Sequence, residues 1–220
     1  MPIHFFGVAA VTTDRNETDL YRPPSPPRWK GRDSLDLIYQ LNERSLQLLR
    51  DTATRQREVW SGLDAAAIRR AARFPFVILD AFFNDEGWWN GVLQQPASSL
   101  AQTPAMSLWP AEVAEKLMGE LLVFAWHMAK WDWRVAQLSL GMWPGVAEVI
   151  AAMTPHQLDI VSARHYGLMR LRWQDDTDFW ARVANAALEG RDAALADIHL
   201  HGKLLLSGEL LARSPSNASI

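Results

Sequence analysis

Histidine and carboxylate side chains come close together near the C-terminus, in a pattern that could support metal chemistry. The segment DIHLH, Asp197 to His201, offers one carboxylate and two imidazoles, which are groups that bind zinc. In a helix Asp197 and His201 share a face, but His199 points elsewhere. No third ligand recurs at a suitable spacing. We therefore expect these histidines to cap helices or to lie at interfaces, with no metal and no other cofactor bound.

Acidic and hydroxyl side chains also occur in groups that could serve acid–base or nucleophilic catalysis. The run DDTD, Asp175 to Asp178, stands where a helix would begin, so capping and stabilisation of the helix dipole explain it more simply. Three serines, Ser139, Ser162 and Ser207, lie within helical patterns and lack the GxSxG turn of a serine nucleophile. No GxGxxG motif follows a strand. The sequence therefore predicts a protein that is not an enzyme.

The composition limits the other functions. The 220 residues include no cysteine, which excludes disulfides, thiolate nucleophiles and cysteine-bound metals. A net charge of -3 provides no general field to hold DNA, so any DNA contact must be local or shared with a basic partner. The apolar stretches are short or interrupted by charge, and we expect a cytoplasmic protein without a membrane span.

Tryptophan is unusually frequent, with 11 in the chain. Large aromatic rings usually fill cores and subunit interfaces. A platform on which nucleic-acid bases stack is the alternative, but such platforms also need exposed rings beside basic residues. We therefore expect the tryptophans to be buried or to contact another subunit.

Proline-rich and polar stretches divide the chain into segments. We predict a proline-rich arm, a helical half, a linker, a second helical domain and a disordered tail, at 1–32, 33–95, 96–110, 111–213 and 214–220. Helical spacing of apolar residues predicts one long helix over 33–60 and another over 111–138. The expected fold is all-α, with long and short helices packed or intertwined and at most short extended segments.

A short helix with a clear start signal occupies the middle of the second domain. Thr154, Pro155 and Gln157 form a predicted capping box, with proline at the first helical position. The next segment, LMRLRW, alternates apolar and basic residues, which indicates a half-buried strand. With the helix before it, this helix could form a helix-turn-helix-like corner that contacts DNA or a partner, or the two could simply pack together. The corner would place four side chains on one rim: Arg164, His165, Arg170 and Arg172.

The two halves resemble each other in the order of their elements. Residues 63–89 and 153–180 both predict a short helix, an extended apolar step, an acidic cap and an aromatic pair, and both follow a long helix. An internal duplication explains this order. A chance similarity between strings of helices explains it equally well.

Several motifs of the second half, in their order, resemble the FlhD subunit of the flagellar master transcriptional activator. These are LGM, an Ala-rich helix ending in AAMT, PHQ with its helix, LMRLRW, and the closing DIHLHGKLLLSGELL, over about residues 112–213. The resemblance implies a helical regulator that dimerises through intertwined helices and joins a zinc-binding FlhC-like subunit at promoter DNA. Arg191 and His199 match the functionally implicated C-terminal stretch of that family, where Gly190 and Leu200 replace polar residues.

Two functions follow from these patterns. One is a transcriptional regulator of flagellum biogenesis that acts on DNA through its partner, with Arg164, His165, Arg170, Arg172, Arg191 and His199 as candidate DNA or partner contacts. The alternative is a helical scaffold or adaptor of a secretion or motility apparatus that does not bind DNA. If both halves are FlhD-like, one chain would mimic the dimer of that family; otherwise it would form a homo-oligomer.

Overall fold

The computed structural model of the protein describes residues 31–52, 57–94 and 107–212. These residues are mostly α-helical and include one pair of short strands, which confirms the predicted fold class. Residues 1–30, 95–106 and 213–220 lie outside the described residues, and they include most of the predicted arm (1–32), most of the predicted linker (96–110) and the predicted tail (214–220).

The first half contains five elements. Its first helix begins at Gly31, two residues before the predicted start, and ends at Asp51; residues 53–56, outside the description, separate it from the next helix. Asp64 and Asp85 cap the two later helices, since their side chains accept hydrogen bonds from the backbone N–H groups of Ala67 and Trp88. The elements are α1 (Gly31–Asp51), α2 (Arg57–Trp60), α3 (Ala65–Ala71), β1 (Leu79–Asp80) and α4 (Glu86–Gly91).

The second half has more helices than the sequence predicted. The helix expected over 111–138 is broken at Asp132, where the backbone is extended, with φ -157°. The Asp132 carboxylate accepts a 2.8 Å hydrogen bond from the Arg134 N–H and so starts a new helix. The elements are α5 (Ala111–Trp131), α6 (Trp133–Leu140), α7 (Pro144–Ala152), α8 (Pro155–His165), the 3-10 turn η2 (Tyr166–Leu168), β2 (Arg170–Leu171), α9 (Thr177–Leu188) and α10 (Asp192–Ala212).

Two predicted helix starts are confirmed in detail. At α8 the Thr154 hydroxyl accepts from the Gln157 N–H at 3.3 Å, and the Gln157 side chain accepts from the Thr154 N–H at 2.8 Å. This reciprocal pair is the predicted capping box. At α9 the acidic run supplies the cap through Asp176, whose carboxylate accepts from the Phe179 N–H at 2.9 Å.

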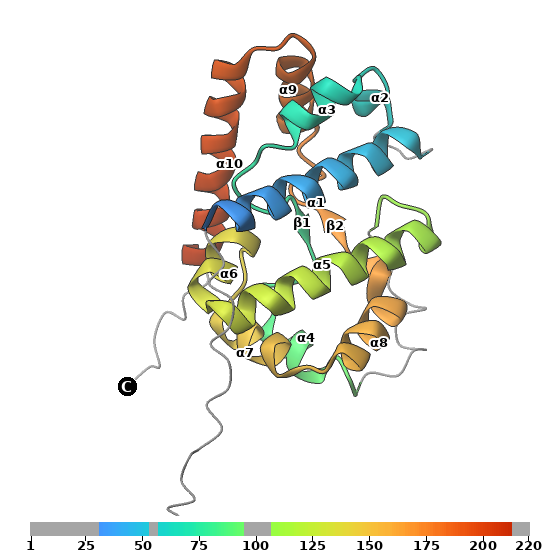
Figure 1. Ribbon diagram of the computed structural model, residues 1–220, viewed down its shortest axis with the longest axis vertical. Coiled ribbons are helices and arrows are strands. Elements are labelled where there is room, and N and C mark those ends of the chain that lie inside the picture. The colour runs from blue at the N-terminus through green and yellow to red at the C-terminus, as the bar shows by residue number, and fades with distance from the viewer. Residues whose placement is uncertain (1–30, 53–56, 95–106, 213–220) are drawn as a thin grey trace, which may run out of the picture.

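The helices form two groups on either side of the strand pair (Figure 1), and each group contains helices from both halves of the chain. In the first group α3 packs against α1 and also against α9, which itself packs against α10. In the second group α5 packs against α6, α7 and α8, and α4 packs against α7. The last helix of each half thus lies with the other half, which is an intertwined arrangement.

The antiparallel strands β1 and β2 join the two groups. Leu79 pairs with Leu171, and Asp80 pairs with Arg170. The buried side chain of Asn42 in α1 holds the start of this region, because its Nδ2 donates to the Phe76 carbonyl at 2.9 Å and its Oδ1 accepts from the Ile78 N–H at 3.0 Å. The strand pair is therefore fixed to the long helix of the first half.

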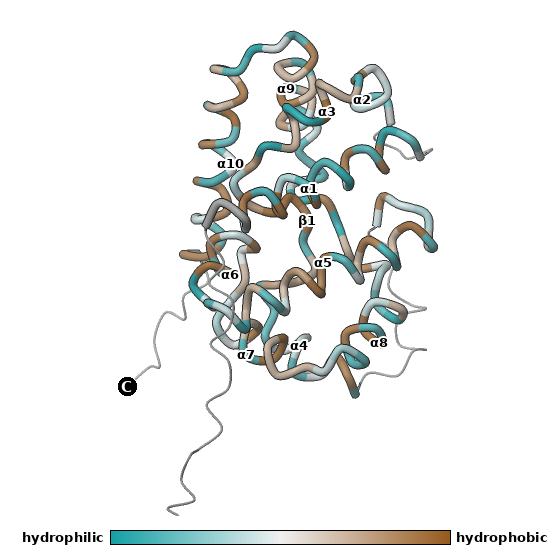
Figure 2. Tube along the Cα trace, in the orientation of Figure 1, coloured by the Kyte–Doolittle hydropathy of each residue, from teal (hydrophilic) through white to brown (hydrophobic). Residues whose placement is uncertain are grey.

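Large aromatic side chains fill the core, and several tryptophans are buried, as predicted from the sequence. Trp60, Trp89, Trp109 and Trp180 are buried, whereas Trp133 on α6 is exposed. The tube in Figure 2 shows apolar residues recurring along the helices that meet at the strand pair. Within the described residues, no helix taken singly has the length and apolar character to cross a membrane; α6 and α7 meet that test only jointly, with a bend of 113° between them.

Candidate functional site

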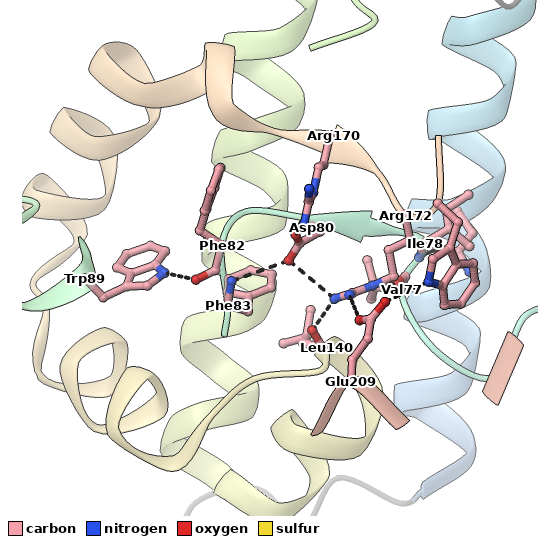
Figure 3. A network of polar contacts seen from close by, with 12 residues as sticks. Val77, Ile78, Asp80, Phe82, Phe83, Trp89, Leu140, Arg170, Arg172 and Glu209 are labelled. Atoms are coloured by element: carbon pink, nitrogen blue, oxygen red, sulfur yellow. Dashed lines mark hydrogen bonds and ion pairs between the residues drawn. The ribbon is translucent and has the colours of Figure 1, made fainter. Parts of the chain in front are cut away.

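Arg172 lies at the centre of a polar network beside the strand pair (Figure 3). Its side chain is only 5% exposed. The guanidinium donates to the carbonyl oxygens of Val77, at 3.1 Å from Nε, and of Leu140. Its Nη1 lies 3.5 Å from Glu209 Oε2. One buried cation thus connects the segment before β1, the end of α6 and the last helix.

Asp80 is the buried anion of the same network. Its Oδ2 accepts from Nε of Arg170 at 2.9 Å and lies 2.9 Å from Nη2 of the same guanidinium. Its Oδ1 accepts from the Phe83 N–H at 3.4 Å and lies 3.7 Å from Arg172 Nη2. Arg170 is partly exposed, and its guanidinium carbon stands 5.5 Å from the centroid of the Phe82 ring. Charges buried at this depth require such partners, because an unpaired one is costly.

Glu209 connects α10 to the network. Its Oε1 accepts from the indole N–H of Trp173 at 2.7 Å, while Oε2 faces Arg172. A cavity of about 180 Å³ opens at this point, lined by Asp80, Arg170, Leu171, Arg172, Trp173, Gln174, Asp175 and Glu209. The two arginines and the carboxylates of Asp80 and Glu209 balance in charge. The network therefore holds elements together, and of its two cations only Arg170 is partly exposed.

The six predicted contact residues do not gather on one face. Arg170 and Arg172 lie in the network, and Arg172 is buried, so the prediction that it stands on an exposed rim is wrong. His165 is also buried, with its ring 5.2 Å from that of Trp88, because α8 packs this end into the core. Arg164 is exposed on α8. The predicted rim of four residues is therefore absent, because His165 and Arg172 are buried.

The two candidates from the C-terminal stretch lie apart from the network. Arg191 is exposed and pairs with Glu189, with 2.6 Å between its Nε and the carboxylate. His199 is half-buried on α10, with its ring 4.3 Å from that of Phe74. These positions make Arg191 a surface ion pair and His199 a packing residue.

Burial changes the titration of two histidines. Desolvation lowers the pKa of His199 to about 4. Desolvation also lowers the pKa of His165, and the nearby Arg164 charge acts in the same direction. Both rings are therefore neutral at pH 7, which suits their aromatic contacts. Within the described residues no group of three or more His, Cys, Asp or Glu side chains is placed to hold a metal ion.

The same local geometry occurs at both strands. Phe82 and Trp173 both have positive φ, 57° and 50°, and each stands three residues before the aspartate that caps the next helix. The numbers of Phe82, Asp85 and Trp89 differ from those of Trp173, Asp176 and Trp180 by one constant offset. The strand register follows the same offset. Replacing each residue of the pair Leu79–Leu171 by its equivalent in the other half gives Arg170 and Asp80, which form the second pair. A local two-fold axis thus relates the halves at the strands.

Sequence reasoning missed three residues that matter here, namely Asn42, Asp80 and Glu209. Asp80 is the one charged residue in the apolar run FVILDAFF, and such an isolated charge indicates a buried ion pair. Asn42 and Glu209 carry no comparable local signal, because polar residues are ordinary in amphipathic helices.

No protein-family model, curated protein or solved structure matches this chain.

Proposed function

We propose that this protein is a non-enzymatic regulatory subunit of the FlhD type, which acts by binding partner proteins and meets promoter DNA only within a complex. The proposal rests on the motif order over 112–213 and on one structural observation. Helices of the two halves are intertwined about a strand pair with two-fold register. A family whose members dimerise through intertwined helices is expected to give this arrangement when two copies are joined in one chain.

The placement of the arginines supports the proposal that a partner makes the DNA contact. Binding to DNA phosphates needs accessible cations on the protein. Its affinity falls as the salt concentration rises, because the release of counterions from the DNA then contributes less. Arg172 is buried, Arg170 is paired with Asp80, and Arg191 is paired with Glu189. The partner suited to this role is the FlhC-like zinc-binding subunit that the resemblance implies.

The outer face of α10 supports binding of another protein. Leu200, Leu204 and Leu211 are 58%, 63% and 74% exposed, and their spacing places them along one side of the helix. Apolar residues recur along α10 in Figure 2. Contiguous exposed leucines of this kind mark protein contacts. We assign this stripe to the partner interface.

A scaffold or adaptor of a secretion or motility apparatus, without a DNA role, is the second candidate. The pairing of the candidate arginines favours it, because Arg170, Arg172 and Arg191 each lie against a carboxylate. Both candidates share the partner interface. They differ only in whether the assembled complex binds DNA.

An electrophoretic shift experiment separates the two. The full chain, an FlhC-like subunit and their mixture are incubated at low salt with a flagellar promoter fragment or a scrambled fragment. We expect a specific shift only with the mixture, and loss of that shift in the Leu204→Glu variant. Leu138→Glu is the matched control, because Leu138 is equally exposed, at 61%, but lies on α6. A stable protein complex that leaves promoter DNA unshifted would support the adaptor and refute the regulator.

A further inference from the structure

Helix α10 lies on a cluster of aromatic rings in the first helix group. This first aromatic cluster consists of Phe74, Phe76, Trp173 and Phe179. A Cβ atom added at Gly202 of α10 would stand 2.9 Å from Phe76 Cζ and 3.3 Å from Phe74 Cε1. Only a glycine allows the helix to approach the rings this closely.

A second aromatic cluster occupies the equivalent place in the other group. The constant offset between the halves relates His165 to Phe74, Phe82 to Trp173 and Trp88 to Phe179. The rings of Trp88 and His165 are 5.2 Å apart, against 6.2 Å for Phe179 and Phe74. Those of Phe82 and Trp88 are 6.2 Å apart, against 5.1 Å for Trp173 and Phe179. The two clusters therefore occupy equivalent positions, and their ring spacings agree to within about 1 Å.

The second cluster differs because no helix of the described residues covers it as α10 covers the first. Helix α10 packs against both α9 and α3, but no helix of the described residues packs in the same way against both α4 and α8. Phe179 is buried as a result, whereas its counterpart Trp88 and the neighbouring Phe82 are partly exposed. Close to the start of α5, the Ser107 N–H donates to the Gly167 carbonyl at 3.1 Å.

An arginine stands beside each cluster. At the first, Glu209 of α10 binds Trp173 and faces Arg172. At the second, Arg170 lies over the Phe82 ring with 36% of its side chain exposed. An acidic residue on an arriving helix would meet Arg170 there, much as Glu209 meets Arg172. Attraction between opposite charges would favour that helix and fix its register.

We propose that Phe82, Trp88 and Arg170 form a docking site for one helix of a partner protein. The helix has the chemistry of α10, with a glycine against the rings and a glutamate seven positions later, as in Gly202 and Glu209. This inference rests on the proposed assembly function but requires no DNA binding. It identifies a partner surface separate from the leucine stripe of α10.

A peptide with the sequence of α10, residues 192–212, is the probe. Fluorescence anisotropy measures its binding to the full chain. We expect saturable binding that weakens at least about tenfold in Trp88→Ser and Phe82→Ser, as for aromatic residues at the centre of an interface. Trp133→Ser is the matched control, since this exposed tryptophan lies on α6, and it should leave the affinity unchanged.

Changes in the peptide test the site without altering the folded protein. A Gly202→Leu peptide should bind at least about tenfold more weakly, because the added side chain cannot fit against the rings. A Glu209→Gln peptide should lose several-fold in affinity, and the loss should shrink at high salt. Absence of binding would overturn the proposal. So would binding that survives Trp88→Ser and Phe82→Ser, which would mean exchange with α10 on the first cluster. Neither readout involves promoter DNA, so a failed shift experiment leaves this result intact.

Discussion

Phe82 and Trp173 adopt the same left-handed backbone conformation at equivalent points after β1 and β2. Bulky residues rarely take this conformation, because it brings Cβ close to the following carbonyl oxygen. Finding it at both strands, each time three residues before a capping aspartate, indicates that the halves follow one backbone plan. The strand register agrees with this two-fold relation.

Arg172 is expected to dominate the stability of the polar network. Arg172→Met leaves the Val77 and Leu140 carbonyls without this donor and Glu209 without this cation, and should lower the free energy of unfolding by about 4 kcal/mol. Arg191→Met is the control at an exposed ion pair and should cost less than about 1 kcal/mol. Urea denaturation followed by circular dichroism measures both. Equal losses would contradict the central role of Arg172.

Two helix-ending glycines offer a second test. Gly141 and Gly190 have φ of 60° and 67°, so alanine is strained at either position. At Gly141 the added Cβ would also stand 2.6 Å from Leu206 Cδ1, whereas at Gly190 nothing lies within 4 Å. Gly141→Ala should therefore lower the free energy of unfolding by about 3 kcal/mol and Gly190→Ala by about 1 kcal/mol. Thermal unfolding that ranked the pair the other way would refute the contact between the α6 end and α10.

Alanine should have opposite effects at two glycines of α10. Gly202→Ala forces a methyl group against Phe76 and Phe74, at a cost of about 2 kcal/mol. Gly208→Ala meets no atom within 4 Å and should stabilise the helix by about 0.7 kcal/mol, because alanine loses less backbone entropy. Differential scanning calorimetry measures whether each substitution raises or lowers the unfolding temperature. A stabilising Gly202→Ala would show that α10 does not sit closely on the first aromatic cluster.

The pKa of His199, lowered to about 4, makes stability depend on pH. As pH falls below 6.5 the unfolded chain binds a proton that the folded ring does not accept until near pH 4, so the free energy of unfolding decreases across this interval. Allowing for partial solvent access, the loss is about 2 kcal/mol. We expect His199→Met to flatten the profile between pH 6.5 and 4 in urea titrations. The double variant with His165→Met should flatten it further, and an unchanged profile would contradict neutral burial of these rings.

The predictable part of the fold came from local rules. Thr154 with Gln157, and Asp176 with the helix that follows it, act through contacts within a few residues, so a sequence pattern suffices to locate them. The break at Asp132 was missed because apolar residues continue on both sides, and periodicity alone favours an unbroken helix. A capping aspartate within an apolar run was the signal that should have counted.

The site was less predictable because its contacts are distant in sequence. Alternation in LMRLRW indicated a strand but placed Arg172 on the outer face, where alternate residues of a half-buried strand point. The carbonyls of Val77 and Leu140 and the Glu209 carboxylate instead give this arginine partners inside the protein. The partners that keep a buried guanidinium charged come from three separate segments, and no local pattern encodes their meeting.

The pairing of β1 with β2 has a consequence for assembly at low abundance. Both strands belong to one polypeptide, so their encounter is a unimolecular step with a high effective concentration. A complex built from two separate chains falls apart when its subunits are diluted, because its apparent stability depends on their concentration. The intertwined core described here is independent of dilution. It would persist in a cell that makes only a few copies of the protein.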